Sequence, residues 1–186
     1  MEEQYRIIED TIRHTFTSVV WSHKIQEKQA DICSTKFRWM ETIRIIAASL
    51  TAAGILSIVF TDQLWLKILS TCISFITIFV SAFFKTFNLQ EMVSVHKATA
   101  NKLVSIRDRL ILLLTKVKIC AGTSQDIMSE YETIIKELNE IYQTAPNTTD
   151  RAVAKARKAL NVTKDNTFTD EETDTFLPKS LQRNKE

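Results

Sequence analysis

The chain has 186 residues, of which 45% are hydrophobic, and its 24 Lys and Arg nearly balance its 22 Asp and Glu. So small a net charge gives no strong basic field, and we expect no nucleic acid to be bound directly. With two Gly and two Pro, the chain lacks the turn residues of a β architecture, which favours an all-α fold.

Residues 4–41 are predicted to form one long cytoplasmic helix, because apolar or small side chains recur every three or four positions. The first part of this stripe is apolar, and its middle, through His23 and Gln26, is polar. No basic region followed by an apolar run opens the sequence, so no cleavable signal peptide is expected. The stripe comprises Tyr5, Ile8, Ile12, Phe16, Val19, His23, Gln26, Ala30, Cys33, Phe37 and Met40.

Two apolar segments follow, predicted as transmembrane helices at 43–61 and 64–84. At about 1.5 Å per residue, each segment covers most of a hydrocarbon layer of about 30 Å. The connection is too short to hold a domain, so an antiparallel hairpin is expected. A buried hairpin in a soluble protein is the alternative, but it needs a larger core than the polar flanks provide. Trp39 and Trp65 are placed as anchors at the two membrane interfaces.

Positive charges close to the hairpin predict its orientation. Lys36, Arg38 and Arg44 precede it, and Lys85, Lys97 and Lys102 follow it, whereas the turn carries Asp62 and only Lys67. The positive-inside rule therefore predicts that both termini are cytoplasmic and that the protein resides in the cell membrane.

After the hairpin, helical periodicity predicts a cytoplasmic helix at 85–118 and a helix pair at 125–160, which complete one domain at 1–160. The second helix of the pair, from about residue 150, is short and basic. From residue 161 to residue 186 polar residues dominate, and this tail is expected to be disordered.

Small and hydroxyl side chains form stripes along the two apolar segments. Small residues let helices approach closely in lipid. The helix-packing candidates in the first segment are Ala48, Ser49, Ala52, Ala53, Gly54 and Ser57. In the second segment, the hydroxyls bond to their own helix carbonyls or join neighbouring helices, or else they line a water-filled path between several hairpins. The pore-lining candidates are Ser70, Ser74, Thr77, Ser81 and Lys85.

No constellation of residues predicts catalysis. The three histidines are scattered, and His96, on the apolar face of its helix, is expected to be a packed residue. Cys33, Cys72 and Cys120 have no metal-ligand spacing, and the two glycines cannot form a phosphate-binding loop. We therefore expect no enzyme activity, no catalytic residue, no metal and no cofactor.

The order of these parts resembles the SLATT family, the SMODS and SLOG-associating two-TM effector domains of bacterial conflict systems. The resemblance covers roughly residues 1–160. Besides the hairpin, it rests on 21–24 (WSHK) before it, on 91–100 (EMVSVHKATA) after it, and on 131–135 (YETII) and 141–146 (IYQTAP) in the final helix pair.

This resemblance implies a homo-oligomeric effector in the bacterial inner membrane that forms a pore and causes abortive infection during antiphage defence. A partner, such as a nucleotide-second-messenger synthetase or a reverse transcriptase, would supply the signal. If a cyclic oligonucleotide binds directly, Arg107, Arg109 and Lys116 are the available anion partners, although a solvated helix face explains them as well. The rival interpretation is a two-span anchor or scaffold whose cytoplasmic helices recruit a partner.

Overall fold

The computed structural model describes the chain except residues 1, 61–62, 166, 180–181 and 183–186, and it describes no side chains at 2, 55–60 and 84–87. The described part forms six helices and no strand, so the predicted all-α fold is confirmed. The helices are α1 (Glu2–Phe60), α2 (Leu64–Phe87), α3 (Leu89–Lys118), α4 (Ser124–Thr144), α5 (Asp150–Asn161) and α6 (Asp170–Phe176).

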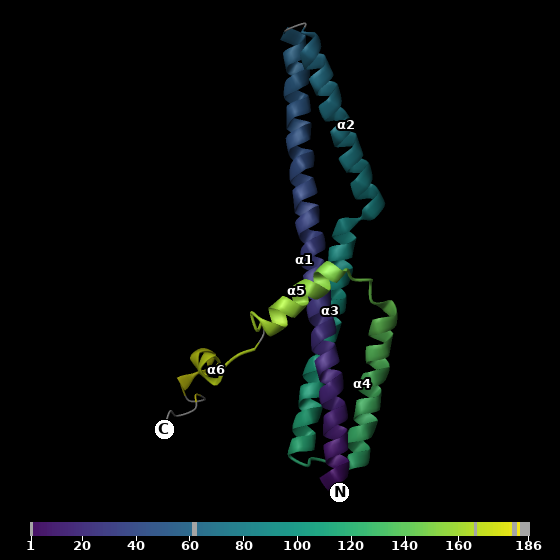
Figure 1. Ribbon diagram of the computed structural model, residues 1–186, viewed down its shortest axis with the longest axis vertical. Coiled ribbons are helices and arrows are strands. Elements are labelled where there is room, and N and C mark those ends of the chain that lie inside the picture. Colours follow the sequence, from purple (N-terminus) through teal and green to yellow (C-terminus); the bar gives the residue numbers. More distant parts are fainter. Residues whose placement is uncertain (1, 61–62, 166, 180–181, 183–186) are drawn as a thin grey trace.

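Helix α1 is the axis of the molecule (Figure 1). It runs without a break for 59 residues, about 90 Å at 1.5 Å per residue. No Pro interrupts it, and its first Gly is Gly54. The prediction that the first helix continues directly into the first apolar segment is therefore confirmed.

The N-terminal half of α1 packs with α3 and α4 in a three-helix bundle. The apolar faces predicted for these helices meet in one core, and α4 begins at a capping box between Thr123 and Asp126. The core consists of Ile8, Ile12, Val19, Leu103, Ile106, Leu110, Leu113, Val117, Ile127, Ile134 and Leu138.

The C-terminal half of α1 and the antiparallel α2 form a helix hairpin that stands beyond this bundle. The two helices lie close together near the apex and diverge toward the lower end of α2 (Figure 1). Residues 61–62 of the predicted turn lie outside the described residues.

A break at Asn88 separates α2 from α3, where the sequence predicted a helix starting at residue 85. Asn88 is left-handed, with φ 35°, and its side chain accepts a hydrogen bond from the Glu91 amide as the N-cap of α3. Asn tolerates the left-handed conformation better than most residues, and the periodicity of apolar residues does not reveal it. This break redirects the chain from the splayed α2 back onto α1.

Helix α5 crosses α1 at the head of the bundle (Figure 1). It buries Ala152, Ala156 and Ala159, whose small size allows a close approach, and it exposes its basic side chains.

The tail was expected to be disordered, and for residues 170–176 this expectation is wrong. Helix α6 forms there because Thr169 and Glu172 make a reciprocal capping box. The preceding Asp165 reaches back to α1, with its Oδ2 3.5 Å from Lys24 Nζ and 3.6 Å from Lys28 Nζ.

Candidate functional site

The two hairpin helices approach each other closely at Gly54 of α1 and Ser70 of α2. A Cβ atom added at Gly54 would lie 2.2 Å from Ser70 Oγ and 3.3 Å from Ser70 Cβ. Ser70 is accordingly buried, with 9% of its surface exposed. The structure thus places Gly54, a predicted packing residue, in the helix contact, and it places Ser70 in the same contact.

The other small residues predicted to pack on α1 are either exposed or have side chains outside the described part of the structure. Ala48, Ser49, Ala52 and Ala53 are exposed in the single chain, and the side chain of Ser57 lies outside the described residues. Ala47, which the sequence analysis did not select, is buried with 6% exposed. Gly54 is seven residues after Ala47, two helical turns, so a helical wheel centred on Gly54 could have found this face.

The hydroxyl groups of α2 bond to their own helix. Ser74 Oγ donates to the Ser70 carbonyl at 2.9 Å, Thr77 Oγ1 to Ile73 at 3.1 Å, and Ser81 Oγ to Thr77 at 2.8 Å. The local bonding that the sequence allowed is therefore present. Each oxygen keeps acceptor capacity, because a hydroxyl has two lone pairs and one proton. The side chain of Lys85, the last member of the predicted stripe, lies outside the described residues.

Helix α2 has the length and composition of a membrane span. Among the described residues, one stretch meets both criteria, Leu64–Phe83, and 11% of the tested window is buried inside the molecule. A core helix of a soluble protein would be mostly buried. Trp39 and Trp65 are 68% and 60% exposed, and Trp39 precedes the end of α1 by about 32 Å of helix.

A buried polar layer lies between the hairpin and the apolar core of the bundle. His96 Nδ1 lies 2.6 Å from Gln26 Oε1, and Gln26 Nε2 donates to the Pro146 carbonyl at 3.2 Å. This pattern assigns the ring proton to Nδ1. His96 Nε2 is then an unprotonated, buried nitrogen without a hydrogen-bond partner among the described residues. The expectation of a packed histidine is confirmed.

The same layer attaches α5 to α1. Gln29 Oε1 accepts hydrogen bonds from the amide of Thr149 at 3.1 Å and from its hydroxyl at 2.8 Å. Lys24 is 2% exposed, and its Nζ lies 2.9 Å from Glu27 Oε2. A lysine is rarely buried unless it is paired, so the Lys24 ion pairs define where the segment after α5 sits. The sequence analysis did not name Gln29, and it included Lys24 only as part of 21–24 (WSHK), because neither residue has a local pattern that predicts these contacts.

The two histidines of this region predict a loss of stability on mild acidification. Burial lowers the pKa of His96; burial also lowers the pKa of His23, where Glu27 opposes the shift and Arg107 and Lys24 add to it. The folded protein therefore binds fewer protons than the unfolded chain below about pH 6.5, and stability falls as pH falls.

We expect the thermal unfolding midpoint to be lower at pH 5.5 than at pH 7.5, and the His23→Gln/His96→Gln variant to show a smaller difference. Net interactions also lower the pKa of the Asp165 carboxyl: burial opposes this shift, and Thr163, Lys24 and Lys28 produce it. Asp165 therefore stays ionised over this range. If wild type and the double variant showed the same difference in unfolding midpoint between pH 7.5 and pH 5.5, the pH dependence would not arise from His23 and His96.

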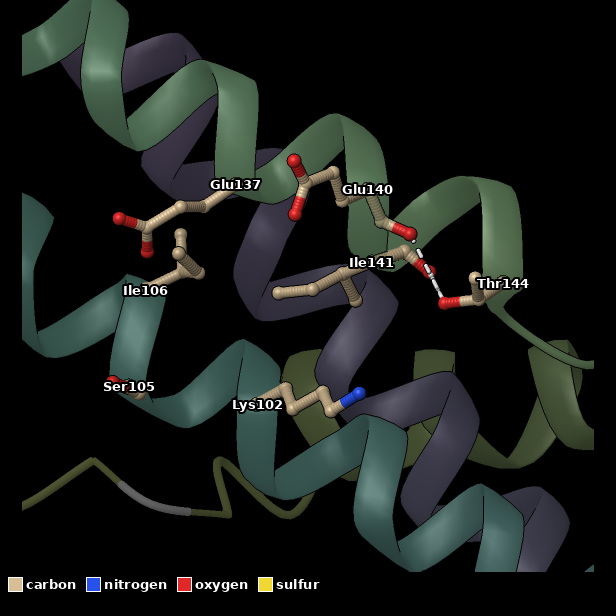
Figure 2. Close-up of a pocket in the computed structure, with 7 residues that line it drawn as sticks. All are labelled: Lys102, Ser105, Ile106, Glu137, Glu140, Ile141 and Thr144. Atoms are coloured by element: carbon tan, nitrogen blue, oxygen red, sulfur yellow. Dashed lines mark hydrogen bonds between the residues drawn. The ribbon is translucent and has the colours of Figure 1, made fainter.

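A hollow between α3 and α4 has a volume of about 400 Å³. Figure 2 shows Glu137 and Glu140 on α4 and Lys102 on α3 at its edges. The Thr144 hydroxyl donates to the Glu140 carbonyl at 3.0 Å, so it is already engaged. With two carboxylates on its rim, this hollow is not suited to an anion.

The three basic residues that the sequence offered for binding an anionic signal are each paired with a carboxylate. Arg107 binds Asp108, with Nη2 2.8 Å from Oδ1, and Arg109 pairs with Glu137. Lys116 Nζ lies 2.7 Å from Glu130 Oε2. The described residues also contain no group of three or more His, Cys, Asp or Glu that could hold a metal ion.

A family model described as SMODS and SLOG-associating 2TM effector domain family 4 matches residues 8–172. No curated protein and no solved structure shows a significant match.

Proposed function

The chain belongs to family 4 of the SMODS and SLOG-associating 2TM effector domains, and from this membership we propose a two-span membrane effector of bacterial antiphage defence. The match at 8–172 bears out the resemblance found in the sequence and extends it into α6. In this proposal the hairpin crosses the inner membrane, with both termini in the cytoplasm, and several copies assemble around a path that disrupts the membrane.

The exposed apolar surface of α2 is the observation that carries the proposal. Phe75, Ile78 and Phe79 are 69%, 65% and 71% exposed, and α2 contains one charged residue among the described side chains, Lys67. Such a surface in water would cause aggregation, whereas a hydrocarbon layer covers it at no cost. The packing of Gly54 against Ser70 provides the close contact that holds membrane helices together.

Residues 64–85 would line the path in the assembled effector, and the cytoplasmic helices would control the assembly. We assign the protein no chemical step. A signal supplied by a partner, such as a nucleotide-second-messenger synthetase or a reverse transcriptase of the same system, would favour one assembly through its differential affinity. Direct binding of a cyclic oligonucleotide has less support, because Arg107, Arg109 and Lys116 each meet a carboxylate.

The hydroxyl bonds within α2 favour a second candidate function, a membrane anchor whose cytoplasmic helices recruit a partner. Ser74, Thr77 and Ser81 satisfy their donors locally and need no water-filled path. In the anchor, the stripe has no role in conduction.

We expect wild type to depolarise cells rapidly once its defence system is induced. We expect the Ser74→Leu/Thr77→Leu/Ser81→Leu variant to abolish this depolarisation. The apolar side chains would dry the path and remove its polar lining. The measurement is membrane potential and dye entry, with insertion and oligomer formation checked in parallel. The matched control, Phe75→Leu/Ile78→Leu/Phe79→Leu, changes the exposed apolar surface and should retain depolarisation. Toxicity with an intact potential in wild type would exclude the pore and support the anchor.

A further inference from the structure

Three hydroxyl side chains of α2 lie on the face of the helix that packs against α1. Ser70, in the contact with Gly54, is 9% exposed, and Ser74 and Thr77 are half-buried. Spacings of four and three residues place these three side chains on one face of a helix. We name Ser70, Ser74 and Thr77 the α2 hydroxyl face. In this structure the α2 hydroxyl face is therefore turned toward α1.

The face of α2 that points away from α1 is mainly apolar. Phe75 and Phe79 are 69% and 71% exposed. With 3.6 residues per turn, they lie about 140° and about 180° around the helix from Ser70. A second copy that approached α2 from outside would therefore meet these aromatic rings rather than the α2 hydroxyl face. A path enclosed by several copies in this arrangement would have a mainly apolar lining, and a narrow apolar lining excludes water.

Helix α1 covers the α2 hydroxyl face tightly near the hairpin apex and loosely at the other end. At Gly54 there is no room even for a methyl group, whose carbon would lie 2.2 Å from Ser70 Oγ. Ser81 follows Thr77 by four residues on the same side of α2, and it is exposed. The two helices diverge toward that end of α2 (Figure 1). The contact between Gly54 and Ser70 therefore closes the apical end of this face.

The hydrogen bonds of the α2 hydroxyl face do not depend on α1. Ser74 Oγ donates to the Ser70 carbonyl at 2.9 Å, and Thr77 Oγ1 donates to the Ile73 carbonyl at 3.1 Å. Both bonds stay within α2, so they persist when α2 moves away from α1. Close packing, rather than these bonds, holds the hydroxyl face against Gly54. Separation of the two helices at this point therefore leaves the donors of Ser74 and Thr77 satisfied.

We propose that the contact between Gly54 and Ser70 is a gate, and that the activating signal separates α1 from α2 there and uncovers the α2 hydroxyl face. The structure shows the closed hairpin. In the open hairpin the hydroxyl oxygens, which keep acceptor capacity, face water in a path shared with neighbouring copies. Gly54 is a positioning residue, because its lack of a side chain lets α1 cover Ser70. The inference rests on the proposed function, since a gate requires a path.

A disulfide between Gly54→Cys and Ser70→Cys measures the closed contact. A Cβ atom at Gly54 would lie 3.3 Å from Ser70 Cβ, close to the separation of about 3.5–4.5 Å found in disulfides. The matched control pair is Ala52→Cys with Ser70→Cys, because Ala52 is exposed on α1. Copper phenanthroline is added to cells that contain the full chain, before or after the defence system is induced, and the cross-linked fraction is followed by gel mobility.

The native cysteines are treated alike in all these variants. Cys72 and Cys120 are exposed and are replaced by Ser, whereas the buried Cys33 is kept. Before induction, the test pair should cross-link within one chain at least about tenfold faster than the control pair, as its geometry allows. After induction its rate should fall about tenfold, because the signal favours the open hairpin.

The disulfide should also act as a lock. Cells whose test pair is oxidised before induction should keep their membrane potential, and dithiothreitol should restore depolarisation. The single variants Gly54→Cys and Ser70→Cys, oxidised in the same way, should depolarise as wild type does. A locked pair that depolarises cells as wild type does would overturn the proposal. An unchanged cross-linking rate in cells that depolarise would also overturn it and would leave the proposed effector function standing.

A second measurement leaves the contact between Gly54 and Ser70 intact. Thr77→Cys is exposed to a charged, water-soluble methanethiosulfonate reagent, and Phe75→Cys on the outer face of α2 is the control. Induction should raise the modification rate of Thr77→Cys about tenfold and leave that of Phe75→Cys unchanged, because only the uncovered face meets water. A Thr77→Cys thiol that stays unmodified in depolarised cells would contradict the gate. If the cross-linking rate falls on induction but wild type does not depolarise cells, the pore fails and the separation of the helices is supported.

Discussion

Replacing Gly54 with leucine is expected to force the two hairpin helices apart and lower the thermal unfolding midpoint by several degrees. Even the single Cβ of alanine would lie 2.2 Å from Ser70 Oγ. Rotation of the Ser70 side chain could move that oxygen, but Ser70 Cβ at 3.3 Å would remain crowded. Overpacking of this kind costs about 1–3 kcal/mol. Alanine alone should favour the helix by about 1 kcal/mol over glycine, so any destabilisation by Gly54→Ala isolates the contact.

Two controls separate the contact from the added bulk. Ala52→Leu adds bulk on the exposed side of the same helix and should leave the midpoint nearly unchanged. The double variant Gly54→Ala/Ser70→Gly reopens the space and should recover most of the stability lost in Gly54→Ala. The measurement is thermal unfolding in lipid nanodiscs, where about 1 kcal/mol corresponds to about 2–4 °C for a chain of this size. Equal midpoints for Gly54→Leu and Ala52→Leu would rule out a close contact between α1 and α2 here.

Replacing Gln26 with leucine should destabilise the bundle by about 2–4 kcal/mol, because it removes one hydrogen-bond partner from each of two groups. His96 is 0% exposed, and its Nδ1–H would lose the acceptor that lies 2.6 Å away. The Pro146 carbonyl would lose the donor from Gln26 as well, at the start of the connection to α5. The predicted loss is larger than for a surface glutamine, since water reaches the His96 site poorly.

A double-mutant cycle checks this account. Gln26→Leu/His96→Leu removes both buried polar partners and should be more stable than Gln26→Leu alone, because no ring nitrogen remains unsatisfied. Gln143→Leu on the exposed face of α4 serves as the control and should change stability by less than about 0.5 kcal/mol. The cycle also requires the single variant His96→Leu. If the free-energy changes of Gln26→Leu and His96→Leu add up to that of the double variant, the hydrogen bond between Gln26 and His96 contributes nothing.

Local patterns in the sequence determined the helices and their apolar faces. The apolar residues that recur every three or four positions along α4 are all buried in the core or packed against it, namely Ile127, Tyr131, Ile134, Leu138 and Ile141. The absence of Pro and the late first Gly determined that α1 continues into the hairpin. These features follow from periodicity and from chain-breaking residues, which act over a few positions. The order of the helices, hairpin and short motifs along the chain also indicated the family, which the match at 8–172 shows.

Tertiary structure alone decided which polar residues act together. Gln29 meets Thr149 across 120 positions, and Lys24 meets Asp165. Neither pair has a signature at short range, because each depends on the path of α5 across α1. The same reason explains why the sequence analysis placed Ser70 in a hydroxyl stripe without its contact to Gly54: the two residues meet only where two helices cross. The sequence thus determined the helices of this protein, and the packing of α1 against α2, α3 and α5 determined its contacts.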